Sequence, residues 1–300
     1  MSLPAPYPEP DLETLLRPRR RPPVRLQVLL YVLTGLTTFA AGAVGWDPET
    51  LLGSDESVAA AAAHWQRGLA YMVAVMATLT AHEAGHFIAA RRHGIPVTLP
   101  FFIPMPVLLT GTMGAVIAMD GARADRRQLF DIAVAGPLAG LALAVPLLAF
   151  GMAAGLPDTD NPFALAPLAS WIQGFVRPDL PGGVTVAPNP FFMAGWVGLL
   201  VTGLNMVPVS QLDGGHICRA VFGAHGNGMA RTVLVACIAA VLCTGQLNWV
   251  PMLVLVILMG VDHPPLREDG RPLGWPRTLL GLGALLIPLA TFMPEPIRLP

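Results

Sequence analysis

This sequence of 300 residues contains no lysine, and all 18 of its basic residues are arginine. Charge of either sign is scarce, because only 12% of the residues are charged, whereas soluble domains average about 25%. The formal net charge of -1 excludes the strongly basic balance typical of nucleic-acid binders, so we expect no nucleic-acid partner. A chain that is 54% hydrophobic and poor in charge indicates a membrane protein.

Cysteine and serine are also scarce. The three cysteines, Cys218, Cys237 and Cys243, form no CxxC pair, so the sequence indicates neither a disulfide framework nor a cysteine-bound metal. With five serines and no GxSG sequence, the chain does not resemble a serine intramembrane protease. It also lacks the GxGD sequence of the aspartyl type.

Long apolar runs, by contrast, are abundant. They predict spans near residues 26–46, 68–90, 129–156, 191–209 and 278–293, and a run over 232–261 that is one long helix or, as we favour, two short ones. We therefore expect an all-α polytopic membrane protein with about six or seven transmembrane helices. Residues 95–118 are apolar but rich in Pro, Gly and β-branched residues, which predicts a small membrane-associated β or re-entrant segment.

The expected organisation is a single polytopic domain over residues 26–293, with its core at 65–225. A disordered cytosolic tail over residues 1–25 precedes it, and residues 157–190 form a loop. With the N-terminus in the cytosol, every arginine except Arg67, Arg177 and Arg298 lies on the cytosolic side, as the positive-inside rule expects.

Costly ionisable groups interrupt the second apolar run, in the stretch TLTAHEAGHFIAARRHG at residues 78–94. His82, Glu83 and His86 form an HExxH motif. On a helix, residues four apart share one face, so the two imidazoles can bind one Zn²⁺ while Glu83 acts as general base. A bound cation also compensates the burial of these groups.

Catalytic zinc usually has three protein ligands, and the third candidate is Asp213. It follows the fourth span and lies on the cytosolic side by the same topology, although Asp-Gly also favours a plain turn. Within that span, Asn205 contacts either a substrate backbone or developing oxyanion, or merely another helix. Pro208 ends the helix and allows the chain to turn Asp213 toward the metal.

Other polar residues carry weaker indications. His216 is either a neighbour of the metal ligands or an interfacial histidine, and Asp131, Arg126 and Arg127 read as interfacial anchors or ion-pair partners. Gly136 and Gly140 form a small-xxx-small face that indicates helix packing.

Two alternative functions are a transporter with histidines along an ion path and an inactive scaffold protein. The polar groups are concentrated at one depth, which disfavours a transporter. The presence of Glu83 together with both histidines and Asp213 disfavours a scaffold, which needs no general base.

Two motifs carry a family resemblance: HEAGH at 82–86 and N-x-x-P-x-x-x-L-D-G-G at 205–215. In this order and spacing they resemble the site-2 proteases, which are intramembrane zinc metalloproteases. Further similar stretches extend the resemblance over residues 65 to about 265, including GTMGAVI at 111–117 and DHPP at 262–265. The likeness is greatest to the plastid-type and related bacterial branch, which lacks a PDZ domain.

The resemblance implies that His82, His86 and Asp213 bind zinc and that Glu83 is the general base. It also implies cleavage of membrane-protein substrates, such as an anti-sigma factor or another membrane regulator, in or near their transmembrane segments. Residues around 110–118 would lie beside the site as β-structure to which an unwound substrate adds as a strand. The expected location is the bacterial plasma membrane, with the active site toward the cytosol.

Overall fold

The protein is described by a computed structural model that covers residues 23–47, 50, 54–119, 123–209, 211–246, 249–260 and 272–298. Within these residues the fold is mostly helical, as expected, with two small antiparallel sheets. The expected tail over 1–25 and the DHPP stretch lie almost wholly outside the described residues. The elements are α2 (Val24–Ala43), α4 (Ser54–Ala63), α5 (Trp65–Arg92), β1 (Phe101–Pro104), β2 (Thr112–Val116), α6 (Arg126–Ala154), β3 (Pro157–Asp158), α7 (Pro167–Val176), β4 (Thr185–Val186), α8 (Pro190–Asn205), α9 (Asp213–Phe222), α10 (His225–Thr244), α11 (Val250–Met259), α12 (Trp275–Ala284) and α13 (Ile287–Thr291).

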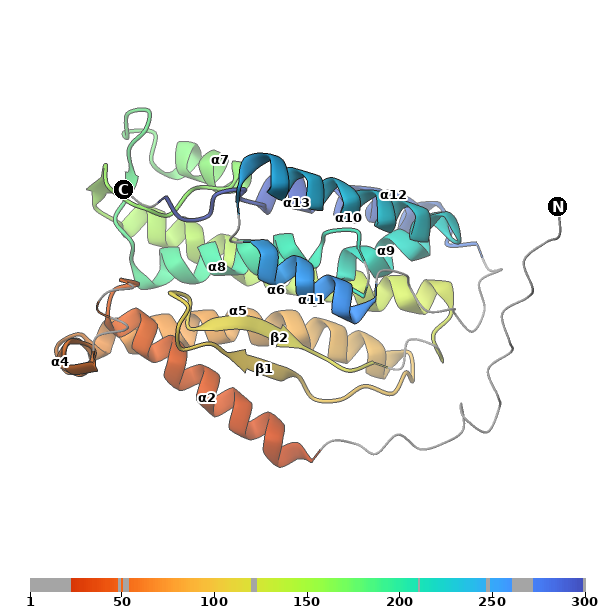
Figure 1. Cartoon of the computed structure of the whole chain (residues 1–300), viewed down its shortest axis with the longest axis horizontal. Helices are drawn as coiled ribbons and strands as arrows, with labels where there is room; N and C mark the ends of the chain where they lie inside the picture. Colours follow the sequence, from red (N-terminus) through yellow and green to blue (C-terminus); the bar gives the residue numbers. More distant parts are fainter. Residues whose placement is uncertain are drawn as a thin grey trace.

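Three helices that pack against one another, α5, α6 and α8, form the centre of the molecule. Figure 1 shows α2 and the β1–β2 hairpin grouped with α5 on one side, and α8, α9 and the C-terminal helices grouped with α6 on the other. The main apolar core lies between these helices, with Tyr71, Leu148 and Trp196 among its fully buried members. This arrangement places α5, which carries the HExxH motif, directly against α6.

Helix α6 begins at a capping box and connects several elements. The Asp125 side chain accepts hydrogen bonds from the backbone N–H groups of Arg127 and Gln128, and the Gln128 side chain accepts one from the Asp125 N–H. Such reciprocal bonds satisfy donors that a helix start leaves unpaired. The helix then continues through Pro137 and Pro146, so the apolar run predicted at 129–156 is one helix despite its prolines.

The prediction of extended structure within residues 95–118 is confirmed. Strands β1 and β2 pair antiparallel with a register shift between Phe102 and Pro104. Neighbouring helices hold the hairpin at its backbone: the Tyr71 hydroxyl donates to the Thr110 carbonyl at 2.9 Å, and Thr37 donates to the Gly111 carbonyl at 2.6 Å. The hairpin therefore has a defined place on the bundle rather than the freedom of an unanchored loop.

Residues 157–190, predicted as a loop, contain more structure than expected. They include the β3–β4 pair and the short helix α7, and Trp196 of α8 donates its indole N–H to the Ala164 carbonyl at 2.7 Å. Arg177 donates to Asp179 and so lowers the pKa of that exposed carboxyl. The sequence prediction missed these elements because each is too short to show a clear periodicity.

Among the described residues, three helices are long and apolar enough to cross a bilayer, namely α2, α6 and α10, and α8 is a shorter apolar helix. These helices support a membrane protein, but they do not confirm about six or seven spans. Helix α5 has 28 residues but carries the charged motif, and the region predicted as a final span is divided into the short helices α12 and α13. The run at 232–261 forms two helices, α10 and α11, as favoured.

Candidate metal centre

Helix α5 presents both motif histidines on its buried face. His82 and His86 are 3% and 4% exposed, and their Nε2 atoms lie 3.2 Å apart. One helical turn separates them, so the spacing in sequence alone aligns the two rings. The prediction that both imidazoles project to one point is therefore confirmed in geometry.

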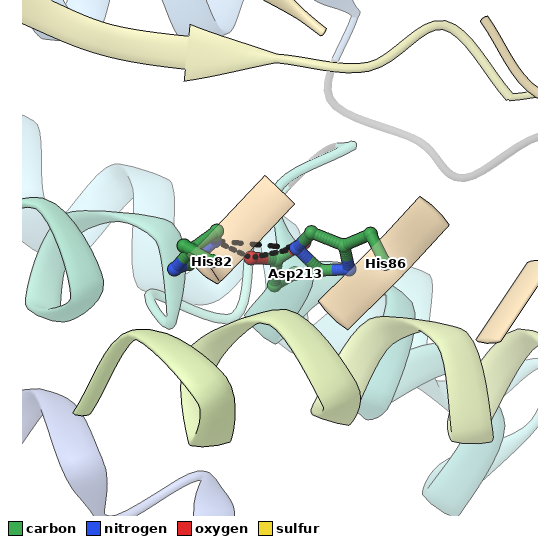
Figure 2. A group of neighbouring side chains, drawn as sticks. All are labelled: His82, His86 and Asp213. Atoms are coloured by element: carbon green, nitrogen blue, oxygen red, sulfur yellow. Dashed lines mark hydrogen bonds and ion pairs between the residues drawn. The ribbon is translucent and has the colours of Figure 1, made fainter. Parts of the chain in front are cut away.

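Asp213 reaches the same point from another part of the chain. Its Oδ2 atom lies 3.2 Å from Nε2 of His82 and 3.2 Å from Nε2 of His86. Figure 2 shows the three side chains pointing toward one another, with the carboxylate between the two rings. The residue is not in a plain turn, as one reading of Asp-Gly-Gly suggested, because it is the first residue of helix α9. The positive end of that helix dipole stabilises the carboxylate.

The donor set fits a zinc ion. Zn²⁺ takes imidazole nitrogen and carboxylate oxygen at roughly 2.0–2.2 Å in tetrahedral geometry, which puts neighbouring ligand atoms about 3.3 Å apart. The three atoms here are separated by 3.2 Å each. Among the described residues, they form one group of neighbouring His, Cys, Asp or Glu side chains able to hold a metal ion. Two nitrogens and an anionic oxygen converging in a buried place match what a dication requires.

The tautomer of His86 is set by a backbone carbonyl. Its Nδ1 donates to the carbonyl oxygen of Ile132 on α6 at 2.8 Å. With the proton on Nδ1, the lone pair of Nε2 faces Asp213 and is available for a metal. Sequence reasoning missed this partner, since a main-chain carbonyl has no residue-type signal.

Two further motif residues lie at the centre. Glu83 is next to His82 on α5 and only 4% exposed, yet it is not a member of the three-residue group, which suits a general base better than a ligand. Asn205, the last residue of α8, places Nδ2 3.4 Å from His82 Nε2. The structure thus brings together all five residues singled out from the sequence, and the functional role of each stays a prediction.

Helix α9 is held from its far end by α6. The Arg126 guanidinium donates to the carbonyls of Ala220 and Val221 in the last turn of α9. A cation there satisfies carbonyls that a helix end leaves unpaired and complements the negative end of the dipole. In these contacts Arg126 binds backbone carbonyls, and its predicted role as an interfacial anchor or ion-pair partner stays a prediction. Its contact with α9 was not visible in the sequence because its partners are backbone atoms more than ninety residues away.

The contacts of Asp131 confirm the prediction that this residue is an ion-pair partner. Its carboxylate accepts from Arg277 of α12 at 2.7 Å, and it lies 3.2 Å from Nε2 of His93, the residue directly after α5. All three side chains are part-exposed. The cluster ties α5, α6 and α12 together at the end of the bundle where the metal centre lies. His216, three residues after Asp213, is half-buried and does not belong to the metal-binding group.

Comparison with known proteins gives one family. Residues 70–244 match the family described as peptidase family M50. The probable zinc metalloprotease EGY1, chloroplastic, of Arabidopsis thaliana is 33% identical over 234 residues, which cover 73% of this chain and 42% of that protein. The probable zinc metalloprotease EGY3, chloroplastic, of Oryza sativa subsp. japonica is 28% identical over 248 residues, which cover 73% of this chain and 41% of that protein.

The chain spans about two-fifths of the length of these curated relatives. No solved structure matches. The relatives are named zinc metalloproteases, which agrees with the predicted cofactor, Zn²⁺. Their names also place them in chloroplasts, so the comparison gives no support to the expected bacterial plasma membrane.

Proposed function

Because this chain belongs to peptidase family M50, we propose that it is an intramembrane zinc metalloprotease. In this proposal it hydrolyses peptide bonds in or near transmembrane segments of membrane-protein substrates. The observation that carries the proposal is the convergence of the buried His82 and His86 with the partly buried Asp213, with Glu83 beside the histidines on α5. A scaffold protein or an ion channel does not need the Glu83 carboxylate next to three converging candidate metal ligands.

The residues divide the chemistry between them. A zinc ion held by His82, His86 and Asp213 would supply the Lewis acidity that this hydrolysis needs at the scissile carbonyl and at the attacking water. Glu83 takes the proton of that water and delivers it to the leaving amine. The amide of Asn205 donates a hydrogen bond to the oxyanion that develops on the substrate carbonyl. Ile132 keeps the His86 ring in one tautomer throughout.

The β2 strand is the proposed docking edge for an extended substrate. It belongs to a two-stranded sheet and pairs with β1 on one side. A Cβ at Gly114 would lie 3.5 Å from a methyl group of Val201 on α8, one helical turn before Asn205, and this contact supports a strand that passes near the metal centre. An unwound substrate segment that adds to β2 satisfies its own backbone hydrogen bonds and needs little sequence match.

In this proposal the metal centre lies in the cytosolic half of the membrane. Arg91 and Arg92 end α5 just past the motif, and Arg126 and Arg127 begin α6 at the same end of the bundle. Arginine clusters of this kind mark the cytosolic ends of spans. Water reaches a shallow site more easily than one at the bilayer centre, and hydrolysis consumes water.

The first test is the zinc content of the full chain purified in detergent, compared with His82→Ala and Asp213→Ala. We expect about one zinc per wild-type chain and a loss in both variants. Glu83→Gln is the matched control, which keeps the metal but abolishes cleavage of single-span membrane proteins produced in the same cells. Wild-type protein that binds no zinc after reconstitution would refute the protease proposal.

A further inference from the structure

Helix α6 contacts the ring of His86 at a residue without a side chain. A Cβ atom at Gly136 would lie 2.0 Å from Nε2 of His86, 2.3 Å from Cδ2 and 2.4 Å from Cε1. These separations are far shorter than any van der Waals contact, and the closest atom is the one that faces Asp213. The position therefore has no room for even a methyl group while His86 keeps its place.

The next glycine on the same face of α6, Gly140, leaves more room for an added Cβ atom than Gly136 does. A Cβ at Gly140 would lie 3.0 Å from Nδ1 of His82 and 3.2 Å from its Cβ. This is tight but can be relieved by a shift of a few tenths of an ångström. Nδ1 is also not the atom of His82 that approaches Asp213. The two glycines of the small-xxx-small face are thus unequal with respect to the metal centre.

The His86 ring has little freedom to avoid an added methyl. Its Nδ1 is bound to the Ile132 carbonyl one helical turn before Gly136, and the residue is only 4% exposed. The two helices already touch through their backbones, because a Cβ at Gly85 would lie 2.4 Å from the Ala135 carbonyl oxygen. Rotation of the ring breaks the bond to Ile132, and separation of the helices moves both histidines away from Asp213.

We propose that Gly136 is a positioning residue of the metal centre: the absence of a side chain there creates the space in which His86 presents Nε2 to the ion. The sequence indicated only helix packing for this glycine. The proposal rests on the proposed function for the identity of the ion as the zinc of a protease. Its steric part concerns the chain alone and can be tested without any metal.

The steric part is tested by a double-mutant cycle on the full chain in detergent with a strong chelator present. The variants are Gly136→Ala, His86→Ala and the two combined. We expect Gly136→Ala to lower the Tm by about 5 °C in the wild-type background, as overpacking does. In the His86→Ala background it should lower the Tm by less than about 1 °C, because the ring that clashes is gone. Equal losses in both backgrounds would overturn the proposal.

The metal part is tested with Co²⁺, whose d–d absorption reports the geometry of its ligands. We expect Gly136→Ala to weaken Co²⁺ binding about 100-fold, or to bind it with an altered spectrum, and Gly140→Ala to stay within about threefold of wild type. Gly198→Ala is the packing control, because its Cβ would lie 2.6 Å from Ala144 Cβ, with no metal ligand among its three nearest neighbours.

The two measurements separate the proposals. Wild-type affinity and spectrum in Gly136→Ala would overturn the positioning role. A spectral change shared by Gly198→Ala would also overturn it, since the effect would then be general packing. Wild-type protein that takes up neither Zn²⁺ nor Co²⁺ refutes the proposed function, whereas the thermal cycle still decides whether Gly136 makes the space for His86.

Discussion

The metal centre has two halves that are built in different ways. In the histidine half, both ligands lie on one continuous helix, α5, and the neighbouring helix α6 contacts their rings directly. In the aspartate half, a single candidate ligand begins a separate ten-residue helix, α9, after the end of α8. The positions of the two histidines follow from helical periodicity and from the close packing of α5 on α6. The position of Asp213 depends on contacts with residues far away in the sequence.

The difference shows where each half is vulnerable. In the histidine half, the sensitive positions touch the rings themselves, as at Gly136. In the aspartate half, Gly214 packs on the preceding turn, and Arg126 binds the opposite end of α9. Changes far from Asp213 should therefore move it, whereas changes far from the histidines should not move them.

The largest expected effect concerns catalysis rather than metal binding. Asn205→Ala should lower kcat about 100- to 1000-fold, the range for loss of one oxyanion donor, and leave zinc content unchanged. Cleavage rate and zinc content of the same preparation check this. A variant that loses zinc and activity together would assign Asn205 to the structure of the aspartate half instead.

The next effect tests whether the aspartate half is as tightly built as the histidine half. A Cβ at Gly214 would lie 2.0 Å from the carbonyl oxygen of Met206, so Gly214→Ala must push α9 away from the turn. We expect zinc affinity to fall about 100-fold, measured by competition with a chromophoric chelator. Gly228→Ala on α10, which has open space around it, is the control and should bind as wild type does.

A smaller effect tests whether a contact at the C-terminal end of α9 helps to position Asp213 at its N-terminal end. Arg126→Ala removes the donor to the last carbonyls of this helix, and we expect zinc affinity to fall about tenfold. Arg126→Lys should recover part of the loss, because a cation near the helix end is retained. Arg127→Ala, which removes an exposed hydrogen bond to the Pro272 carbonyl, is the matched control. Equal zinc affinity in all three variants would contradict the idea that α9 is held from its far end.

The smallest effect concerns the ion-pair cluster at the same end of the bundle. Asp131→Asn removes the charge that pairs with Arg277 and lies beside His93, but these side chains are part-exposed. Exposed pairs contribute at most about 1 kcal/mol, so we expect a Tm decrease of no more than about 4 °C and unchanged zinc affinity. A clear loss of zinc affinity would show that the histidine half also depends on remote contacts.

Much of the site was predictable because its signals are local or chemically rare. The HExxH spacing predicts that His82 and His86 converge, and the structure confirms it. Asp213 was found because ionisable groups at one depth in two apolar spans are unusual. The extended reading of 95–118 followed from its Pro and Gly content, and two strands lie there.

Other predictions failed or stayed incomplete for physical reasons. The short elements within 157–190, and α9 itself, have too few residues to show a period, and their tertiary contacts hold them in place. The number of spans stays a prediction, because among the residues that the structure describes, helix length and apolar character mark three helices clearly. The acceptor for His86 and the acceptors for Arg126 at the end of α9 are backbone carbonyls, which every residue carries.

The sequence by itself predicted the chemistry of this protein: which side chains could bind a metal ion, that two of them share a helix face, and that a carboxylate lies beside them. These follow from residue type and the 3.6-residue period, which are local properties. Only the tertiary structure decided how the halves meet. The glycine at 136 faces His86, the carbonyl of Ile132 sets its tautomer, and Arg126 holds α9. Such contacts arise from the packing of distant segments, where a distance of a few tenths of an ångström decides whether a side chain fits.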